Sequence, residues 1–314
     1  MKGKPKISFI VPAKNEEDSL QILYQEIVSS VEPLNKTFEM ILVDDGSTDN
    51  TFDVAKKLHL LDKRVKVLKL RGNFGKSAAL QTGFEHAQGD IIFTLDADLQ
   101  DDPKEISKFL AKINAGYDLV TGWKKIRHDP FSKTFPSSIG NWMTRLFTGI
   151  KVHDLNCGFK CYKHGVIKNL QLYGELYKYI PVLAEKQNFK VGEIVVSHRP
   201  RKYGKSKFGW QRNIKGFIDM LTVIFLTGYL QRPGHFFGTF GFISFFFGFL
   251  IGLYITYLRI TTGGIQDHHP LLYLGMLLMI IGVQLITTGL IAEMVVSFNQ
   301  KGKNSKVYIE KELL

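Results

Sequence analysis

Two long stretches of the sequence contain no Asp, Glu, Lys or Arg: Gly234 to Leu258 and Leu271 to Ala292. A helix crosses the hydrocarbon core of a bilayer with roughly 20 apolar residues. The alternative is a pair of buried helices in a soluble domain, but such helices rarely stay uncharged around their whole circumference for this length. The two stretches therefore predict two transmembrane helices, and they confine any soluble domain to the residues before them.

Lys and Arg flank these two stretches unequally. The chain between residues 199 and 215 is rich in both, and Lys301, Lys303 and Lys306 follow the second stretch, whereas Arg259 stands alone between the stretches. The positive-inside rule then predicts that both termini lie in the cytoplasm. The N-terminus does not resemble a signal peptide, because MKGKPKISFIVPAKNEE returns to a charged residue after seven uncharged ones.

Much of the net charge of +12 lies near the predicted spans. Anionic or phosphorylated lipid is therefore favoured over nucleic acid as a partner, and the sequence holds no nucleic-acid-binding motif. The two cysteines, Cys157 and Cys161, have no second Cys or His pair that would complete a zinc site. We expect both to be reduced thiols with a structural role.

Short β-rich stretches alternate with helical patterns in the first half of the chain. Strands are expected over 6–13, 38–46, 65–70, 90–98 and 118–123, and helices over 15–31, 49–60, 75–87 and 103–116, with Ser47 and Thr48 capping the helix over 49–60. Further on we expect helices over 135–149, 172–187 and 208–230 and strands over 156–163 and 191–201. The alternation predicts an α/β fold with a largely parallel, doubly wound sheet flanked by helices.

Polar clusters follow four of these strands, at residues 12–16, 44–48, 71–76 and 96–100. Ligands of such sheets bind beyond the carboxyl ends of the strands. One cluster would be an ordinary turn, but four on the same edge indicate a binding site.

The fourth cluster opens an acidic run, LDADLQDDPKEI. Asp102 as N-cap, Pro103 at N1 and Glu105 at N3 would start the next helix, and Asp101 would complement its dipole. Asp96 and Asp98 remain, and two carboxylates this close are costly to ionise together unless a cation intervenes. They predict a Mg²⁺ or Mn²⁺ site that bridges to substrate phosphates, with a solvated turn as the alternative.

Asp44, at the end of the second strand, is a hydrogen-bond acceptor for a base or a ribose. By itself the stretch DDGSTD is a weak signal, because Asp-Gly-Ser is common turn chemistry. The neighbouring stretch VPAKNEE strengthens it.

Together these segments resemble a known family. The segments are VPAKNEE, LVDDGSTDNT, RGNFGKSAAL, GFEHAQGD, LDADLQDDP, CGFK and RKYGKSK, followed by two spans. They resemble family 2 glycosyltransferases of the GT-A fold, in particular the polyprenyl-phosphate hexosyltransferases, which include dolichol-phosphate mannose synthases and undecaprenyl-phosphate glucosyltransferases. The resemblance covers nearly the whole chain.

The resemblance implies roles for individual residues. Asp96, Asp98 and Gln100 would hold the metal. The nucleotide sugar would contact Pro12, Lys14, Glu16, Asp44, Asp96, Ala97, Asp98, Lys178, Arg201 and Lys207. The lipid phosphate would be received by Lys124, Lys133 and Ser137, with Asn141 near them. Asp98, Lys124 and Arg201 would be catalytic, and Lys124 stands where family members carry Arg, whose two-pronged geometry a lysine lacks.

The implied reaction moves a hexose from a nucleotide sugar of the UDP-glucose or GDP-mannose type to a polyprenyl phosphate such as undecaprenyl or dolichyl phosphate. The lipid phosphate is already an anion, so an inverting single displacement needs no general base. The implied domains are a cytoplasmic catalytic domain (1–207), an interfacial helix (208–231), a transmembrane hairpin (232–298) and a cytoplasmic tail (299–314). A homo-oligomer is compatible with the sequence, which leaves the oligomeric state open.

Three alternatives remain. A processive polysaccharide synthase would carry a Gln-x-x-Arg-Trp motif, which GWQRN is not. A glycosyltransferase acting on a glycan or lipid hydroxyl in cell-envelope synthesis would need a base, for which Asp154 is the nearest candidate. A non-enzymatic membrane scaffold would not need Asp96, Asp98, Gln100 and Arg201 together.

Overall fold

The computed structural model describes residues 5–125, 141, 144–146, 148–200, 233–265 and 267–300. The chain forms two compact units, Met1–Val223 and Ile224–Leu314. The junction of the units falls outside the described residues. So do the predicted interfacial helix and the predicted tail beyond residue 300, and the predicted domain boundaries stay predictions.

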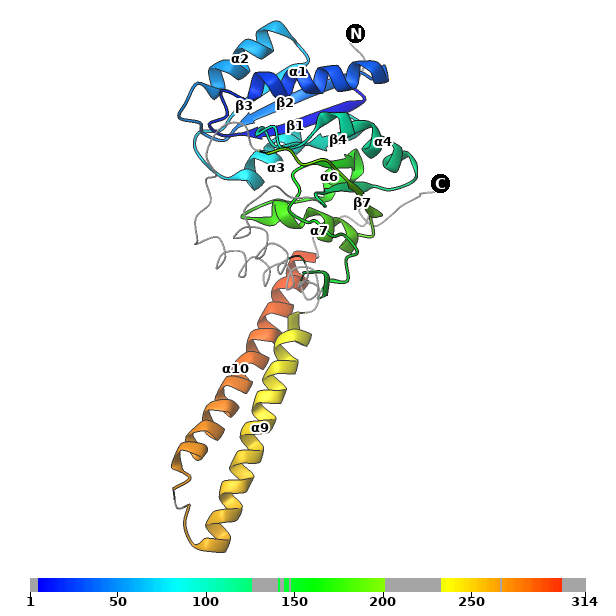
Figure 1. Cartoon of the computed structure of the whole chain (residues 1–314). Coiled ribbons are helices and arrows are strands. Elements are labelled where there is room, and N and C mark those ends of the chain that lie inside the picture. The colour runs from blue at the N-terminus through cyan, green and yellow to red at the C-terminus, as the bar shows by residue number, and fades with distance from the viewer. Residues whose placement is uncertain are drawn as a thin grey trace. The chain divides into compact units, whose positions relative to one another are not determined.

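The first unit is built on a seven-stranded mixed sheet with the order β3-β2-β1-β4-β6-β5-β7 (Figure 1). The strands are β1 (Ile7–Ala13), β2 (Phe38–Asp44), β3 (Val65–Lys69), β4 (Ile91–Thr94), β5 (Leu119–Trp123), β6 (Lys160–Lys163) and β7 (Val191–Val195). Only β6 runs antiparallel to its neighbours, β4 and β5. The predicted α/β sheet is confirmed.

The register of the strands brings the polar clusters to one edge. Ala13 pairs with Asp44, and Asp44 pairs with Lys69, so β1, β2 and β3 end together. Thr94, the last residue of β4, pairs with Ile10. The strand predicted over 90–98 therefore ends four residues early, and the segment with Asp96 and Asp98 is a loop at the same edge.

Helices cover both faces of the sheet (Figure 1). They are α1 (Leu20–Val31), α2 (Thr51–Leu61), α3 (Lys76–His86), α4 (Ile106–Asn114), α6 (His164–Asn169) and α7 (Ile180–Lys186), with 3₁₀ turns η1 (Glu32–Leu34), η2 (Pro103–Glu105) and η3 (Leu176–Tyr179). Alternation along β1 sends Phe9 into the core beneath α1 and α4, where it stacks on Phe93 at 5.3 Å. Ile10 points to the other face, where α3 approaches it so closely that only a glycine, Gly83, fits.

Two local expectations are wrong. Ser47 and Thr48 do not cap α2, whose N-cap is Asn50. Instead both bond to Asn15: its backbone N–H donates to Ser47 Oγ at 3.0 Å, and its Oδ1 accepts from the Thr48 N–H at 2.9 Å. The helix expected over 172–187 is shorter, comprising η3 and α7, and α6 was not predicted.

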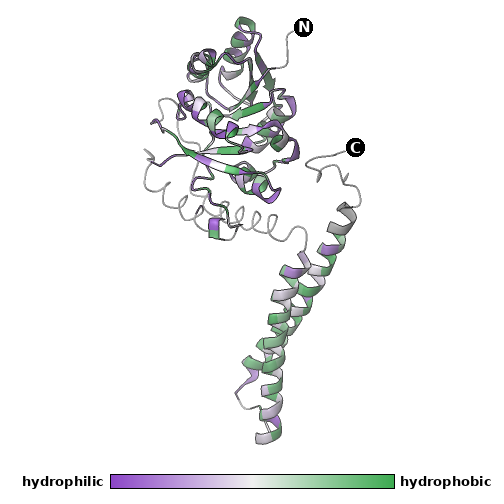
Figure 2. Ribbon diagram, turned by 90° about the vertical axis from the view of Figure 1, so that its right-hand side faces the viewer, coloured by the Kyte–Doolittle hydropathy of each residue, from purple (hydrophilic) through white to green (hydrophobic). Residues whose placement is uncertain are grey.

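The second unit is a hairpin of α9 (Pro233–Thr262) and α10 (His269–Gln300). Both helices are long and apolar enough to cross a membrane, and Figure 2 shows their predominantly hydrophobic colouring. The two uncharged stretches of the sequence lie within them.

Glycines join the two helices of the hairpin at seven-residue intervals. A Cβ on Gly241 would lie 2.7 Å from the carbonyl oxygen of Gly282, and one on Gly248 would lie 2.6 Å from that of Gly275. No other residue type allows backbones to approach this closely, as in other membrane helix pairs with small residues at the contact. At the open end of the hairpin, the Gly234 N–H donates to Glu293 Oε2 at 2.9 Å.

Candidate active site

The loops at the carboxyl edge of the sheet are tied to one another through Asp45. Its carboxylate accepts hydrogen bonds from the backbone N–H groups of Phe74, at 2.7 Å, and Gly75, at 3.0 Å. Gly46 has a φ of +67°, and a Cβ there would lie 2.5 Å from the carbonyl carbon of Gly72. The acidic turn and the RGNFGK loop therefore form one packed unit, in which Asp45 has a structural role.

One carboxylate oxygen of Asp44 has no hydrogen-bond partner among the described residues. The residue is 2% exposed, and its Oδ1 accepts from the Ser47 N–H at 2.9 Å. Its Oδ2 is buried, and no group in the described part of the chain hydrogen-bonds it. A buried carboxylate oxygen without a partner is costly, so this atom is a ready acceptor for an N–H or O–H group of a ligand.

The first predicted loop lies beside Asp44. Pro12 is in β1, paired with Val43 of β2, and Lys14 follows the strand directly. The Glu16 N–H donates to Thr51 Oγ1 at 2.7 Å, and Glu16 Oε2 accepts from Ser19 Oγ at 2.9 Å. The predicted nucleotide-binding residues of the first two loops are thus brought together at one edge.

The candidate metal ligands follow β4. Asp98 is 8% exposed, and its Oδ1 accepts from the Gln100 N–H at 3.2 Å. Leu99 between them has a φ of +61°, a left-handed conformation that is uncommon for a side chain of this kind. The Gln100 carbonyl accepts from the Arg199 N–H at 2.9 Å, so the segment after β7 fixes this turn.

Asp96 forms an ion pair with Lys76, the first residue of α3. Burial lowers the pKa of Lys76, but the charge and hydrogen bond of Asp96, together with the charges of Tyr177 and Asp98, outweigh burial and raise the pKa. Conversely, burial raises the pKa of Asp96, but the charge and hydrogen bond of Lys76, together with the charges of Lys124 and Lys160, more than offset burial and lower the pKa. Lys76 thus lies at the candidate site, and the sequence interpretation gave it no role, although it lies in the quoted RGNFGKSAAL segment.

The turn before β6 forms a wall behind Asp96. A Cβ on Gly158 would lie 2.4 Å from Asp96 Oδ2, so a larger residue there would displace the Asp96 carboxylate. Lys160, 3% exposed, donates to the Cys157 carbonyl, and burial lowers its pKa to about 8. This second lysine was also missed, because within CGFKCYK it looked like an ordinary strand residue.

Asp101 differs from its prediction. It was expected to be an exposed residue that complements the dipole of the next helix. Instead it is 1% exposed, and its Oδ1 lies 2.8 Å from Lys124 Nζ. Burial lowers the pKa of Lys124, but the neighbouring acidic groups, chiefly Asp101, together outweigh burial and raise it. The helix start itself is held by Asp102, whose Oδ1 accepts from the Lys104 N–H at 3.0 Å. Glu105 pairs with Lys108 at 2.5 Å.

Lys178 lies in η3, where its Nζ is 2.6 Å from Glu175 Oε2. The ring of Tyr177 lies 5.0 Å from Lys76 Nζ and 5.5 Å from Lys178 Nζ. The Tyr177 N–H donates to Ser77 Oγ at 3.2 Å, which fastens η3 to α3. Tyr177 therefore links Lys178 to the Lys76–Asp96 pair.

Other predicted residues complete the picture. Ala97 is buried between the two aspartates, and Asn141 is buried in a helical turn. Lys133, Ser137, Arg201 and Lys207 lie outside the described residues. In the part of the chain that the structure describes, no group of three His, Cys, Asp or Glu residues is placed to hold a metal ion. The cysteines are free and buried, as expected.

Comparison with known proteins settles the family. Residues 8–170 match the family model of glycosyl transferase family 2. The chain belongs to this family. It is 36% identical over 312 residues to a dodecaprenyl-phosphate galacturonate synthase of Rhizobium johnstonii, covering 98% of this chain and 92% of that one. It is 34% identical over 291 residues to an undecaprenyl-phosphate 4-deoxy-4-formamido-L-arabinose transferase of Shewanella sediminis, covering 91% and 86%.

Solved structures share the fold of this family 2 glycosyltransferase. Glucosyl-3-phosphoglycerate synthase from Mycobacterium tuberculosis, in complex with Mn²⁺, UDP and phosphoglyceric acid, matches with a TM-score of 0.55 at 16% identity. The match covers 71% of this chain and 78% of that one. The predicted family and the predicted GT-A fold are therefore confirmed, and the chain is a glycosyltransferase.

Proposed function

We propose that this glycosyltransferase transfers a sugar from a nucleotide sugar to a polyprenyl phosphate, with inversion at the anomeric carbon. The observation that carries the proposal is the Asp96–Asp98 loop, which lies beside Lys76 and Lys160 at the carboxyl edge of the sheet. The chain then continues into two apolar helices. Two relatives that match nearly its full length are named for polyprenyl-phosphate products, which supports the same acceptor class here.

The donor would lie across the first, second and fourth loops. Asp44 Oδ2, buried and without a partner in the described residues, would accept a hydrogen bond from the base or the ribose. Pro12, Lys14 and Glu16 would line the same pocket. Donors of the UDP and GDP type both carry suitable N–H groups, so the test below includes both.

Asp96, Asp98 and Gln100 fit a divalent cation, Mg²⁺ or Mn²⁺. The Lys76 ammonium lies against Asp96, and this ion pair supports a position for a cation beside the carboxylate. Two carboxylates and an amide oxygen are hard oxygen donors, and Mg²⁺ commonly completes its coordination with phosphates and water. When bound, the ion would offset charge that develops on the leaving diphosphate.

Several side chains of this chain would position the reactants. Lys76 and Lys178, together with Arg201 and Lys207, would stabilise the diphosphate, as groups preorganised for developing charge do. Lys124, Lys133 and Ser137 would receive the lipid phosphate, and at Lys124 that phosphate must compete with Asp101. The acceptor oxygen is already anionic, so placement in line with the anomeric carbon is the main requirement.

The competing acceptor class, a hydroxyl group, is less well supported. It would require a catalytic base, and Asp154 was the candidate. Asp154 is 1% exposed and accepts hydrogen bonds from the backbone N–H groups of Asn156, at 3.1 Å, and Lys124, at 3.4 Å. These contacts give it a structural role in the loop before β6.

The membrane arrangement is part of the proposal. The two helices would insert as a hairpin, with the catalytic unit and both termini in the cytoplasm, because Lys and Arg flank the hairpin on one side. Reporter fusions at the C-terminus and in the loop after Thr262 test this. Alkaline phosphatase activity from the C-terminal fusion would contradict the orientation.

The activity is tested with membranes that contain the full chain, undecaprenyl phosphate and a panel of labelled UDP- and GDP-sugars, including uronic acid and amino-pentose donors. We expect label in a lipid that mild acid hydrolyses, with wild-type chain but not with the Asp98→Asn variant. Label that enters only an acid-stable glycoside would establish a hydroxyl acceptor and overturn the proposal.

A further inference from the structure

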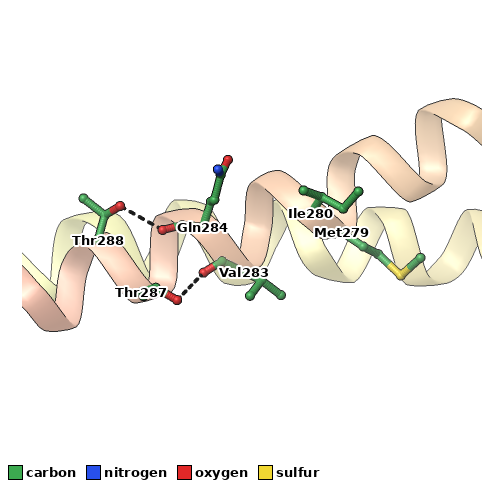
Figure 3. A pocket seen from close by; sticks show the side chains of 6 residues that line it. All are labelled: Met279, Ile280, Val283, Gln284, Thr287 and Thr288. Atoms are coloured by element: carbon green, nitrogen blue, oxygen red, sulfur yellow. Dashed lines mark hydrogen bonds between the residues drawn. The ribbon is translucent and has the colours of Figure 1, made fainter.

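The hairpin and the catalytic unit differ in the groups that they offer to a phosphate. A shallow groove of about 480 Å³ on α10 (Figure 3) is lined by Met279, Ile280, Val283, Gln284, Thr287 and Thr288. None of these side chains is charged, and the hydroxyl groups of Thr287 and Thr288 donate to carbonyl groups of their own helix, at 2.9 Å each. In the catalytic unit, by contrast, two lysines lie against one tyrosine ring.

That ring belongs to Tyr177, in η3. Its centroid lies 5.0 Å from Lys76 Nζ and 5.5 Å from Lys178 Nζ. A cation within about 6 Å of a ring centroid is attracted by the electron-rich face of the ring. One ring therefore contacts both of the described ammonium groups that the proposed function assigns to the diphosphate.

The position of the ring is fixed by α3, the helix that begins with Lys76. The Tyr177 N–H donates to Ser77 Oγ at 3.2 Å, and Ser77 is 1% exposed. Five residues before Tyr177, the Leu172 N–H donates to Gln81 Oε1 at 3.0 Å. The segment that carries the ring is thus fastened to α3 at two points, and the ring and Lys76 are held at a constant separation.

Each lysine also has a carboxylate partner. Lys76 pairs with Asp96, and Lys178 Nζ lies 2.6 Å from Glu175 Oε2. A divalent cation at Asp96 and Asp98 would draw on the same carboxylate that Lys76 uses. The ring and the diphosphate are then the partners that remain for Lys76, so the ring keeps its ammonium group at the site.

We propose that Tyr177 is a positioning residue of the donor site. Its ring holds the ammonium groups of Lys76 and Lys178 at the spacing at which both meet the diphosphate of a nucleotide sugar. Tyr177 takes part in no bond that forms or breaks, and it acts through the two lysines. The inference rests on the proposed function, because it requires that the site binds a nucleoside diphosphate.

The test measures binding rather than turnover. Isothermal titration calorimetry on the full chain, in detergent with Mn²⁺, gives the dissociation constants of UDP, GDP and their monophosphates UMP and GMP. We expect Tyr177→Leu to weaken binding of the diphosphate about 5- to 30-fold, as the loss of two cation–π contacts in a partly desolvated site predicts. Binding of the monophosphate should weaken less than about threefold, because it offers one phosphate to two lysines.

Three variants control for the side chain itself. Tyr177→Phe keeps the ring and should bind the diphosphate within about twofold of the wild type. Tyr177→Met, an unbranched apolar replacement, should behave as Tyr177→Leu does. Tyr173 is a tyrosine of the same segment and is 58% exposed, so Tyr173→Leu is the matched control and should leave both affinities unchanged.

Two results would overturn the inference. One is a diphosphate affinity that neither Tyr177→Leu nor Tyr177→Met reduces. The other is an equal loss of diphosphate and monophosphate affinity, which would assign Tyr177 a purely structural role. Wild-type chain that binds neither UDP nor GDP would refute the proposed function and the inference with it, whereas binding and transfer that do not depend on Tyr177 would refute the inference alone.

Discussion

The buried pair of Asp101 and Lys124 permits a test that separates stability from binding. Asp101 is 1% exposed, the Lys124 side chain is 13% exposed, and Oδ1 and Nζ are 2.8 Å apart. At an effective dielectric constant of about 20, two charges at this separation attract by about 6 kcal/mol. Desolvation cancels much of this, but removing one partner leaves the other buried and uncompensated, at a cost of about 3–5 kcal/mol.

We therefore expect Asp101→Leu to lower the free energy of unfolding of the catalytic unit by about 3–5 kcal/mol, which corresponds to about 6–20 °C in Tm. The assay follows a thiol-reactive fluorophore during heating of the solubilised chain. Cys157 and Cys161 are both buried in this unit, so the dye reports its unfolding. The surface pair of Lys6 and Asp90 is the matched control, and its loss should change Tm little.

The double variant Asp101→Leu/Lys124→Met decides what Lys124 does. Replacing a buried ion pair by apolar groups of similar size is often neutral or stabilising, so we expect most of the Tm to return. If Lys124 also receives the lipid phosphate, the Michaelis constant for polyprenyl phosphate stays raised in the stable double variant. A double variant that remains as unstable as Asp101→Leu would refute the ion-pair reasoning.

Three further predictions use the same chain. Asp98→Ala should abolish sugar transfer while expression and insertion persist, and substantial residual transfer would mean that the metal motif is misread. Asp45→Ala removes the carboxylate that accepts hydrogen bonds from the backbone N–H groups of Phe74 and Gly75 in the loop after β3. These charge-assisted hydrogen bonds contribute about 1.5–3 kcal/mol each. We therefore expect the Michaelis constant for the sugar donor to rise at least about tenfold, and Asp45→Asn to have a smaller effect. Burial lowers the pKa of Lys160 to about 8, below its unfolded value of about 10.4. Between these two pH values the unfolded chain binds more protons than the folded chain, so folding becomes more favourable as the pH rises. The free energy of unfolding of the wild type, relative to Lys160→Met, should therefore increase from about pH 8 to about pH 10 in metal-free buffer. A flat difference would contradict the assigned burial of that amine.

The sequence was sufficient to predict the sheet and the edge at which the candidate site residues gather, because hydrophobic alternation and polar residues at strand ends are local signals. It was also sufficient to single out Asp96 and Asp98, which no helix cap explains. Asp101 was misjudged because its burial depends on Lys124, beyond a helix and a strand, and on a bridge to His198. Contacts between segments far apart in the sequence produce no periodic pattern of residues from which they could be predicted.

Other misses have equally specific causes. Ser47 and Thr48 are good helix caps in isolation, but Asn15 from another loop takes their hydrogen-bonding groups. The six residues of α6 are too few to show a helical period. Lys160 could have been proposed as a site residue, because it is a charged residue in an otherwise apolar strand and lysines are rarely buried without a partner.

The glycine contact in the hairpin has a consequence for how this chain tolerates change in length. Seven residues fall about 20° short of two full turns, so the line of glycines drifts slowly around each helix and the two helices must coil gently to keep it facing inward. A single inserted residue would rotate every glycine beyond it by about 100°. Side chains too large for the contact between Gly241 and Gly282 would then take their place. Deletions and insertions in α9 or α10 should therefore be tolerated only in steps of whole heptads, whereas the loop between the helices is free to vary.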